Sequence, residues 1–215
     1  MAQLPTGSTN QIYTSLAAAK AISGISNATE AVVSSTAHGY SNGDVVFIES
    51  GWGRLNKRAY RIKSVATDSY VLEGCNTTNT TFYPASGGAG NGYKAQTPVQ
   101  ITQLLGMNST GGDPKTVAYK YFESDVEYSI NDGFTAVSRT MEIDADAIGG
   151  TAYSLLLSLT ETGANTVLKT MTKNGSFTLL PCTVALNEEV VMTDGQVNRV
   201  RLAVNGTNRS TRYAS

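Results

Sequence analysis

Alternation of apolar and polar positions predicts strands over most of this chain. Val200, Leu202 and Val204 occupy every second position, which is the period of a strand with one apolar face. Residues 166–180 hold two β-prone runs around Asn174-Gly175, and such a pair between two strands predicts a hairpin. Further turns are predicted at Asp132-Gly133, Asp194-Gly195 and Asn205-Gly206. The chain is therefore expected to be mainly β.

Helix signals are few. The best candidate is residues 144–159, where Tyr153, Leu156 and Leu157 fall on one side at helical spacing. Gly149-Gly150 weakens a helix through this stretch by about 1 kcal/mol per glycine. A helix that begins only after the two glycines is therefore an open alternative. Residues 15–21 are Ala-rich but short, and strand, helix and arm all stay open for them.

Residues 20–84 predict a small β domain of their own. Four short strands are expected, separated by turn-rich segments. They are residues 31–35, 44–49, 59–65 and 69–72. The expected core consists of Val33, Val46, Ile48, Tyr60, Ile62, Val65, Tyr70 and Leu72.

The other boundaries follow from composition. Residues 85–94 are Gly-rich and predict a flexible linker. Residues 95–215 predict a longer, mostly β domain that contains the helix candidate. Residues 1–19 are expected to be an N-terminal arm together with the first strand of that larger domain.

Composition bears on the partners. Charged residues make up 15% of the 215 residues, against about 25% in a typical soluble domain. This deficit favours a chain with much surface in contact with other protein. The net charge of −1 gives no strong attraction to nucleic acid or anionic lipid. We expect no secretory signal at the N-terminus, and no apolar run approaches the roughly 20 residues of a membrane span.

Candidate chemistry is sparse. The single histidine, His38, lies near Ser41 and Asp44, but residues so close in sequence rarely reach the geometry of a catalytic triad. We expect His38 to form hydrogen bonds within its own loop. One histidine and the distant Cys75 and Cys182 do not make a zinc site, and a disulfide between these cysteines is not expected. No catalytic residue, metal site or cofactor is predicted.

One acidic pattern suggests a function. Residues 122–130 are interpreted as a strand, which would place Glu123, Asp125 and Glu127 on one face. An ordinary solvated sheet surface explains such a face, and so does the wall of a water-filled channel. We take the three carboxylates as candidate channel-lining residues.

Two segments resemble the tail tube proteins of siphovirus-type bacteriophages, which have long non-contractile tails. The first begins at Leu4-Pro5-Thr6-Gly7-Ser8 and runs into Asn27-Ala28, and the second spans residues 121–134. Between them, residues 33–46 contain His38-Gly39 and Gly43-Asp44 and are similar to a small β-barrel module of phage tail proteins. That module distantly resembles a domain of ubiquitin-activating enzymes, whose activity does not carry over.

The resemblance implies a β-sandwich core with one short helix, whose sheets join those of neighbouring copies into a closed barrel. It implies stacked rings, commonly of six members, that form the tube through which DNA leaves the capsid. Glu123, Asp125 and Glu127 would face this lumen, and DNA would pass without specific binding. Leu4, Pro5 and Thr6 would belong to an arm that contacts the next ring, and the inserted module would decorate the outside.

The implied partners are further copies of this chain, the tape measure protein and the tail terminator. The implied location is the virion tail, after synthesis in the host cytoplasm, with no membrane association. Two alternatives stay open beside the tube subunit. One is another tail, baseplate or decoration protein whose module binds the host surface. The other is a small hydrolase in which His38 is essential.

Overall fold

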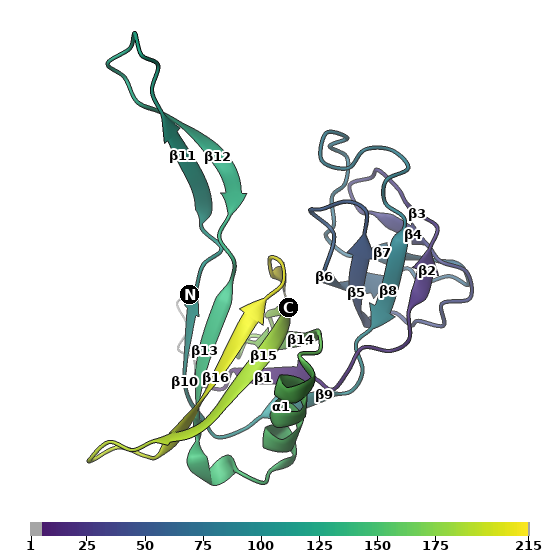
Figure 1. Cartoon of the computed structure of the whole chain (residues 1–215). Coiled ribbons are helices and arrows are strands. Elements are labelled where there is room, and N and C mark those ends of the chain that lie inside the picture. Colours follow the sequence, from purple (N-terminus) through teal and green to yellow (C-terminus); the bar gives the residue numbers. More distant parts are fainter. Residues whose placement is uncertain (1–5, 215) are drawn as a thin grey trace.

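The computed structural model describes residues 6–214 and is mainly β, with two large antiparallel sheets, a projecting hairpin and one α-helix (Figure 1). The first sheet, called the large sheet below, has the order β10-β13-β16-β15-β14-β1-β9, and β17 pairs with β15 beside this path. Its strands are β1 (Thr9–Tyr13), β9 (Pro98–Ile101), β10 (Leu104–Thr110), β13 (Ser138–Asp144), β14 (Thr166–Met171), β15 (Phe177–Val191), β16 (Arg199–Gly206) and β17 (Thr211–Tyr213).

The predicted alternation and hairpin of the large sheet are confirmed. Val200, Leu202 and Val204 are fully buried on one face of β16, and they contribute to a core that β13, β15 and the helix complete. The connection between β14 and β15 is a tight turn in which Gly175 takes a φ of 85°. Glycine adopts this conformation without the steric cost that other residues incur.

The helix α1 (Thr151–Thr162) begins after the two glycines, so the second of the two helix alternatives is correct. Gly149 has a φ of 85°, which turns the chain after the short 3-10 helix η1 (Ala145–Ala147). Tyr153 and Leu156 are buried as predicted, whereas Leu157 is only half-buried beside the core. The helix packs on β15 and β9 and ends at Gly163 in the left-handed conformation.

The second sheet, here called the module, covers residues 20–94 and has the order β2-β8-β5-β6-β7-β4-β3. Its strands are β2 (Lys20–Ile22), β3 (Gly24–Ile25), β4 (Val32–Ser34), β5 (Val45–Ser50), β6 (Arg58–Lys63), β7 (Ser69–Leu72) and β8 (Gly90–Lys94). The four strands predicted from the sequence correspond to β4, β5, β6 and β7. Every residue of the predicted core lies in the module's core, with Val65 only half-buried.

The linker prediction is wrong in its second half. Residues 90–94 form β8, which pairs with β2 on one side and with β5 on the other. Only glycine fits at position 90, because a Cβ on Gly90 would come within 2.0 Å of the Glu49 carbonyl oxygen. The glycines of this stretch therefore permit close strand packing instead of flexibility.

The module is inserted between two neighbouring strands of the large sheet. The chain leaves at the end of β1 and returns at the start of β9, and β1 and β9 are paired with each other. The two connections also touch, because Leu16 pairs with Ala95 and the Ala17 N–H donates to the Lys94 carbonyl at 2.8 Å.

The module also packs against the large sheet. Val45, Phe47 and Ala59 of β5 and β6 meet Phe177 and Tyr213 in a third buried cluster. The Tyr213 hydroxyl accepts the backbone N–H of Arg61 at 2.8 Å across this contact. The two sheets are therefore held together by an apolar seam with polar contacts around it.

Candidate assembly surface

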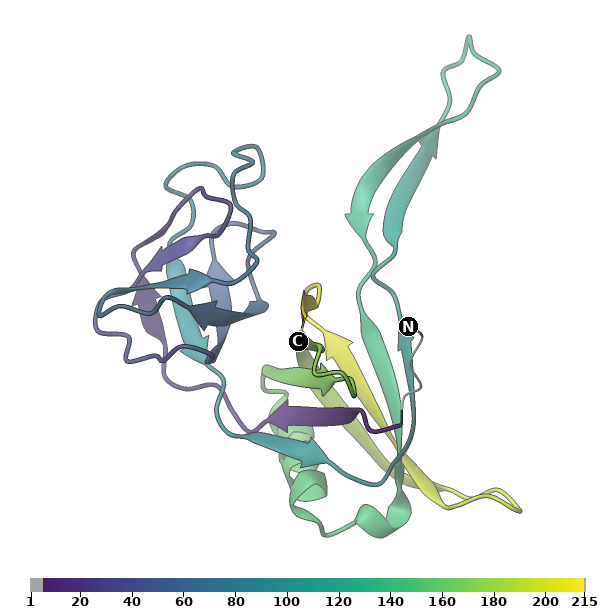
Figure 2. The same ribbon diagram turned by 180° about the vertical axis from the view of Figure 1, so that it is seen from behind.

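A two-stranded hairpin projects away from both sheets. It consists of β11 (Pro114–Tyr119) and β12 (Tyr128–Phe134), which continue from the ends of β10 and β13. Figure 2 shows the same arrangement from behind, with the hairpin reaching beyond the rest of the chain. None of the residues 113–134 is buried. An isolated two-stranded hairpin is marginally stable in water, so contact with another surface would stabilise this one.

The exposed apolar side chains of the molecule gather on the hairpin and on β10. Of the 14 large hydrophobic residues that are exposed in the described chain, nine lie between residues 105 and 134. They are Leu105, Met107, Val117, Tyr121, Phe122, Val126, Tyr128, Ile130 and Phe134. Val117 and Ile130 are direct cross-strand partners and share one face. Such a concentration marks a surface for contact with another protein.

Three tyrosines fix the end of the hairpin. Tyr119 and Tyr128 are opposite each other in the ladder, and their rings stack with centroids 5.5 Å apart. The ring of Tyr121 lies 5.5 Å from that of Tyr119 and 5.8 Å from that of Tyr128. Because residues 119 and 128 are paired, the chain must reverse between them.

The strand predicted over residues 122–130 is therefore wrong for residues 122–127, and only residues 128–130 belong to a strand. Residues 120–127 form the loop at the hairpin tip, in which the Ser124 N–H donates to the Tyr121 carbonyl at 3.2 Å. Glu123, Asp125 and Glu127 are all exposed in this loop. The alternation that would have placed them on one strand face does not exist, and their orientation toward a channel stays a prediction.

The turn predicted at Asp132-Gly133 is also wrong, because both residues lie within β12. Gly133 has a φ of 101°, and its N–H donates to the Asn131 side chain at 2.9 Å. The ladder between β11 and β12 shifts register at this point. The Asp-Gly pair thus makes a bulge that bends the hairpin, not a chain reversal.

The large sheet ends in edge strands. In the described chain β10 pairs only with β13, and β9 pairs only with β1. Leu105 and Met107 are exposed on β10, directly below the hairpin. An unprotected edge with apolar side chains is a template for strand pairing with another chain.

The sequence matches the family model described as phage tail tube protein, TTP, over residues 50–215. The chain belongs to the phage tail tube protein family. It is accordingly a structural protein of the virion tail.

Comparison with solved structures lists two assemblies of gene transfer agents. A chain from the virion of a native gene transfer agent particle is 11% identical, with a TM-score of 0.44, over 54% of this chain and 89% of that chain. A chain from the tail of an empty particle with C6 symmetry is 11% identical, with a TM-score of 0.43, over 54% and 87%. No curated protein matches.

The predicted arm of this tail tube protein is only partly described. Leu4 and Pro5 lie outside the described residues, and Thr6 lies in an exposed turn. The following residues do not form a free arm, because β1 is paired on both sides with β14 and β9. Ile12 is fully buried in the core of the large sheet. Any contact of Leu4, Pro5 and Thr6 with another ring stays a prediction.

His38 has a structural role in the module. Its Nδ1 accepts the Tyr40 N–H at 3.0 Å within the loop, as predicted, which leaves Nε2 to donate to the Ala66 carbonyl at 2.9 Å. The ring is buried against Tyr40 and Tyr70. Both ring nitrogens are therefore committed to backbone groups.

The two cysteines lie in separate cores and are not bonded to each other. Burial raises the pKa of the Cys182 thiol to about 12, so it is a neutral core residue at physiological pH. Burial also raises the pKa of Cys75. Among residues 6–214 no group of three metal-binding side chains occurs, and no helix there is long and apolar enough to cross a membrane.

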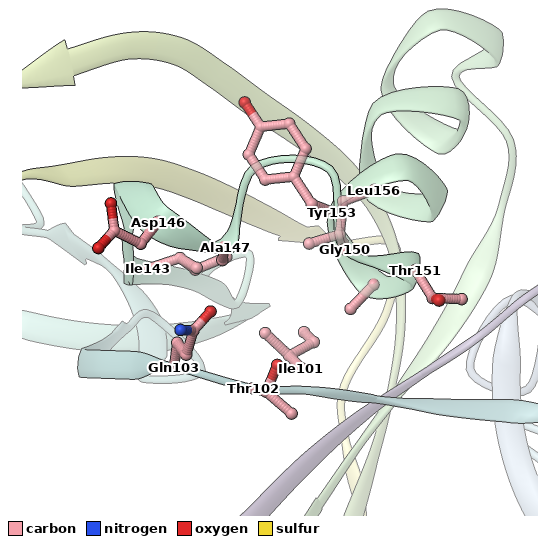
Figure 3. Close-up of a pocket in the computed structure, with 11 residues that line it drawn as sticks. Ile101, Thr102, Gln103, Ile143, Asp146, Ala147, Gly150, Thr151, Tyr153 and Leu156 are labelled. Carbon is pink, nitrogen blue, oxygen red and sulfur yellow. The ribbon is translucent and has the colours of Figure 1, made fainter.

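A small cavity of about 140 Å³ lies between η1, the start of α1 and the segment after β9. Figure 3 shows Ile101, Ile143 and Leu156 among its lining residues, with the single carboxylate of Asp146 at one side. No lysine, arginine, histidine or cysteine lines it. The cavity thus offers one acid without a partner base or nucleophile.

Sequence reasoning missed the apolar part of the assembly surface. The signal was present, because Val117, Tyr119 and Tyr121 alternate with small or polar residues as in a strand. That alternation predicts a strand. It does not reveal that both faces of the strand are left uncovered by the rest of the described chain.

Proposed function

We propose that copies of this tail tube protein close into rings and that the rings stack into a tube for DNA passage. Six members per ring are expected. The observation that carries the proposal is the projecting hairpin, whose strands expose apolar side chains along their length, with only Phe134 at the base lying beside Arg209. A surface of this kind costs free energy in water and is stabilised when a neighbouring copy covers it.

The unpaired edges support closure of the ring. If β10 of one copy contacts the sheet of its neighbour, the edge that invites aggregation disappears. A ring made in this way uses different surfaces of each copy, so its contacts are heterologous and close by rotation. The module lies across the seam from the large sheet, and we propose that it lies outside the tube.

The remaining partners are proposed from the same function. The tape measure protein would occupy the lumen during assembly, and the tail terminator would cap the tube. Double-stranded DNA would pass without specific binding, in keeping with a net charge of −1. The chain would be made in the host cytoplasm and then incorporated into the virion.

The assembly is tested by negative-stain microscopy and analytical ultracentrifugation of the concentrated protein. Rings or tubes with a central hole are the expected result. Val117→Lys places a charge in the apolar face of the hairpin and should prevent tubes, because the buried charge would lack a partner. Val32→Lys is the matched control, since Val32 is an exposed valine on β4 of the module. A protein that remains a single copy at every concentration contradicts the proposal.

A further inference from the structure

A cleft of about 490 Å³ lies where three parts of the chain meet: the module, the base of the hairpin and the turn after β16. Arg54 and Arg58 of the module line one wall, Phe134 and Val137 line another, and Arg209 lines the third. No aspartate or glutamate is among the lining residues. The cleft therefore carries three positive charges and no negative one.

The three guanidinium groups are held in place without a carboxylate. Arg54 lies 3.2 Å from the centroid of the Phe82 ring, and Arg209 lies 3.9 Å from that of Phe134. Arg58 donates to the Thr211 hydroxyl at 3.4 Å, and its Nε is buried without a hydrogen-bond partner in the described structure. None of the three forms an ion pair with another residue of the described chain. They are preorganised for an anion that the same copy does not supply.

The hairpin tip has the complementary charge. Lys120 contributes one positive charge, and Glu123, Asp125 and Glu127 contribute three negative charges, so the tip carries 1 − 3 = −2. All four side chains are exposed. The surrounding Tyr121, Phe122 and Val126 are exposed as well and would cover apolar surface when the tip docks.

Tip and cleft lie at opposite ends of the hairpin. Phe134, at the base of β12, lines the cleft, whereas residues 120–127 form the far end in Figures 1 and 2. The two sites therefore do not meet within one copy. Copies arranged head to tail along the hairpin direction bring the tip of one to the cleft of the next, which is a contact that repeats without limit.

We propose that the arginine cleft receives the acidic hairpin tip of a second copy of this chain, in the adjacent ring. The inference rests on the proposed assembly and names the contact that joins one ring to the next. It gives Glu123, Asp125 and Glu127 a docking role, in place of the lumen-lining role expected from the sequence. Opposite charges in a partly desolvated cleft favour the correct register and reject the reversed one.

Charge reversal of two exposed residues on each side tests the contact. Arg54→Glu with Arg209→Glu changes the cleft from +3 to 1 − 2 = −1, and Glu123→Lys with Asp125→Lys changes the tip from −2 to 3 − 1 = +2. In each double variant alone, the tip and the cleft carry charges of the same sign and repel each other. Each should therefore need a protein concentration at least roughly tenfold higher for tube growth.

A mixture of the two variants is the decisive sample. In an equimolar mixture, the acidic tip of one variant fits the basic cleft of the other, and the basic tip fits the acidic cleft. Tubes that alternate the two variants should form near the concentration required by the unmodified protein. The chain with all four substitutions should also assemble alone, because its tip and cleft are both reversed.

The control reverses the same number of carboxylates away from the tip, with Glu189→Lys at the exposed end of β15 and Asp194→Lys in the loop between β15 and β16. This variant should not rescue the cleft variant when the two are mixed. Circular dichroism and thermal unfolding of each variant alone establish that the fold is retained. A cryo-microscopy map of unmodified tubes gives an independent readout, with tip carboxylates expected within about 4 Å of the cleft guanidinium groups.

The outcomes separate the two levels of the proposal. If the unmodified protein forms no rings or tubes, the proposed assembly is wrong and the docking fails with it. If the unmodified protein forms tubes and both charge-reversed variants do so equally well, only the docking is overturned. A map that places Glu123, Asp125 and Glu127 on the lumen wall also overturns the docking while it supports the assembly.

Discussion

The module and the hairpin are both built from antiparallel strands, yet they obtain their stability from different sources. The module encloses Trp52, Tyr60 and Tyr70, each at most 2% exposed, in a core of its own. The hairpin has its own ladder, interrupted by one bulge, but it encloses nothing, because both of its faces meet solvent. Burial within the chain specifies the first region, and burial between chains is needed for the second. The same β-type sequence pattern thus serves two different tasks.

The largest effect is expected from one substitution made in both regions. Ile62 is 0% exposed in the module core, whereas Ile130 is 58% exposed on the hairpin. Ile62→Ala should lower the free energy of unfolding by about 2–5 kcal/mol, because it removes buried methyl groups and leaves a cavity. Ile130→Ala should change it by no more than about 0.5 kcal/mol.

Urea unfolding of the dispersed protein measures both values. Equal losses for the two variants would break the comparison between the regions. They would mean that the hairpin is packed against its own chain in solution.

A somewhat smaller effect is expected at alkaline pH. Burial, with a further contribution from the Asp44 carboxylate, raises the pKa of Tyr40 to about 12, and its hydroxyl donates to the Gly92 carbonyl at 2.9 Å. The folded pKa lies above the unfolded value near 10, so this stabilisation is complete below pH 10. It is lost as pH rises from 10 to 12, by about 1–2 kcal/mol in total, because solvent near the partly buried hydroxyl screens the effect.

Unfolding by urea at pH 9 and at pH 11 should show about half of this loss, because pH 11 lies midway between the two pKa values. Tyr40→Phe serves as the control. Because this variant lacks the hydroxyl, its free energy of unfolding should fall less between pH 9 and pH 11 than that of the unmodified protein. A slope unchanged by the substitution would contradict the assignment.

A still smaller effect is expected at acid pH. The Arg61 guanidinium pairs with the Glu73 carboxylate, with one contact of 2.6 Å, and holds the pKa of Glu73 below its ordinary value. A lowered folded pKa gives stability that is present above the unfolded value near 4.5 and is lost as pH falls below it. The loss should be about 1 kcal/mol, because the pair is partly solvated. Glu73→Gln should remove this acid dependence in chemical unfolding between pH 6 and pH 3.

The smallest effect on stability is expected from removal of the hairpin. Gly111 and Ala136 are adjacent at its base, since a Cβ on Gly111 would come within 1.8 Å of the Ala136 carbonyl oxygen. Replacing residues 112–135 by Asn-Gly should therefore rejoin β10 and β13 as a short hairpin. The free energy of unfolding should change by less than about 1 kcal/mol, because nothing buried is lost. Tube formation seen by microscopy should nevertheless stop, and persistent tubes would exclude the hairpin from the assembly surface.

The sequence predicts the module well because its signals are local. The run Val45-Val46-Phe47-Ile48 and the alternation in β6 and β7 suffice to define the strands and most of the core. His38 is also predictable, because a histidine between turn residues finds backbone partners nearby. The missed strand β8 shows the limit of composition, since its glycines are selected by close backbone contact across the sheet.

The hairpin is harder to predict for a physical reason. The pairing of Tyr119 with Tyr128 sets the position of the tip, and that register depends on partners across the ladder instead of on the local alternation of residues 122–130. The arginine cleft is harder still, because Arg54 and Arg209 are far apart in sequence and meet only after the module packs on the large sheet. Nothing in the composition of either segment indicates that meeting.

Strand β5 has a consequence for how this protein can vary. Val46 and Ile48 point into the module, whereas Val45 and Phe47 point into the seam with the large sheet. A saturation mutagenesis library should therefore show four consecutive intolerant positions here, where an ordinary surface strand shows every second position permissive. A substitution in this strand is tolerated only if the packing of the core on the same face changes with it, and the strand borders two cores. Its residues should therefore be the slowest to diverge among related phages.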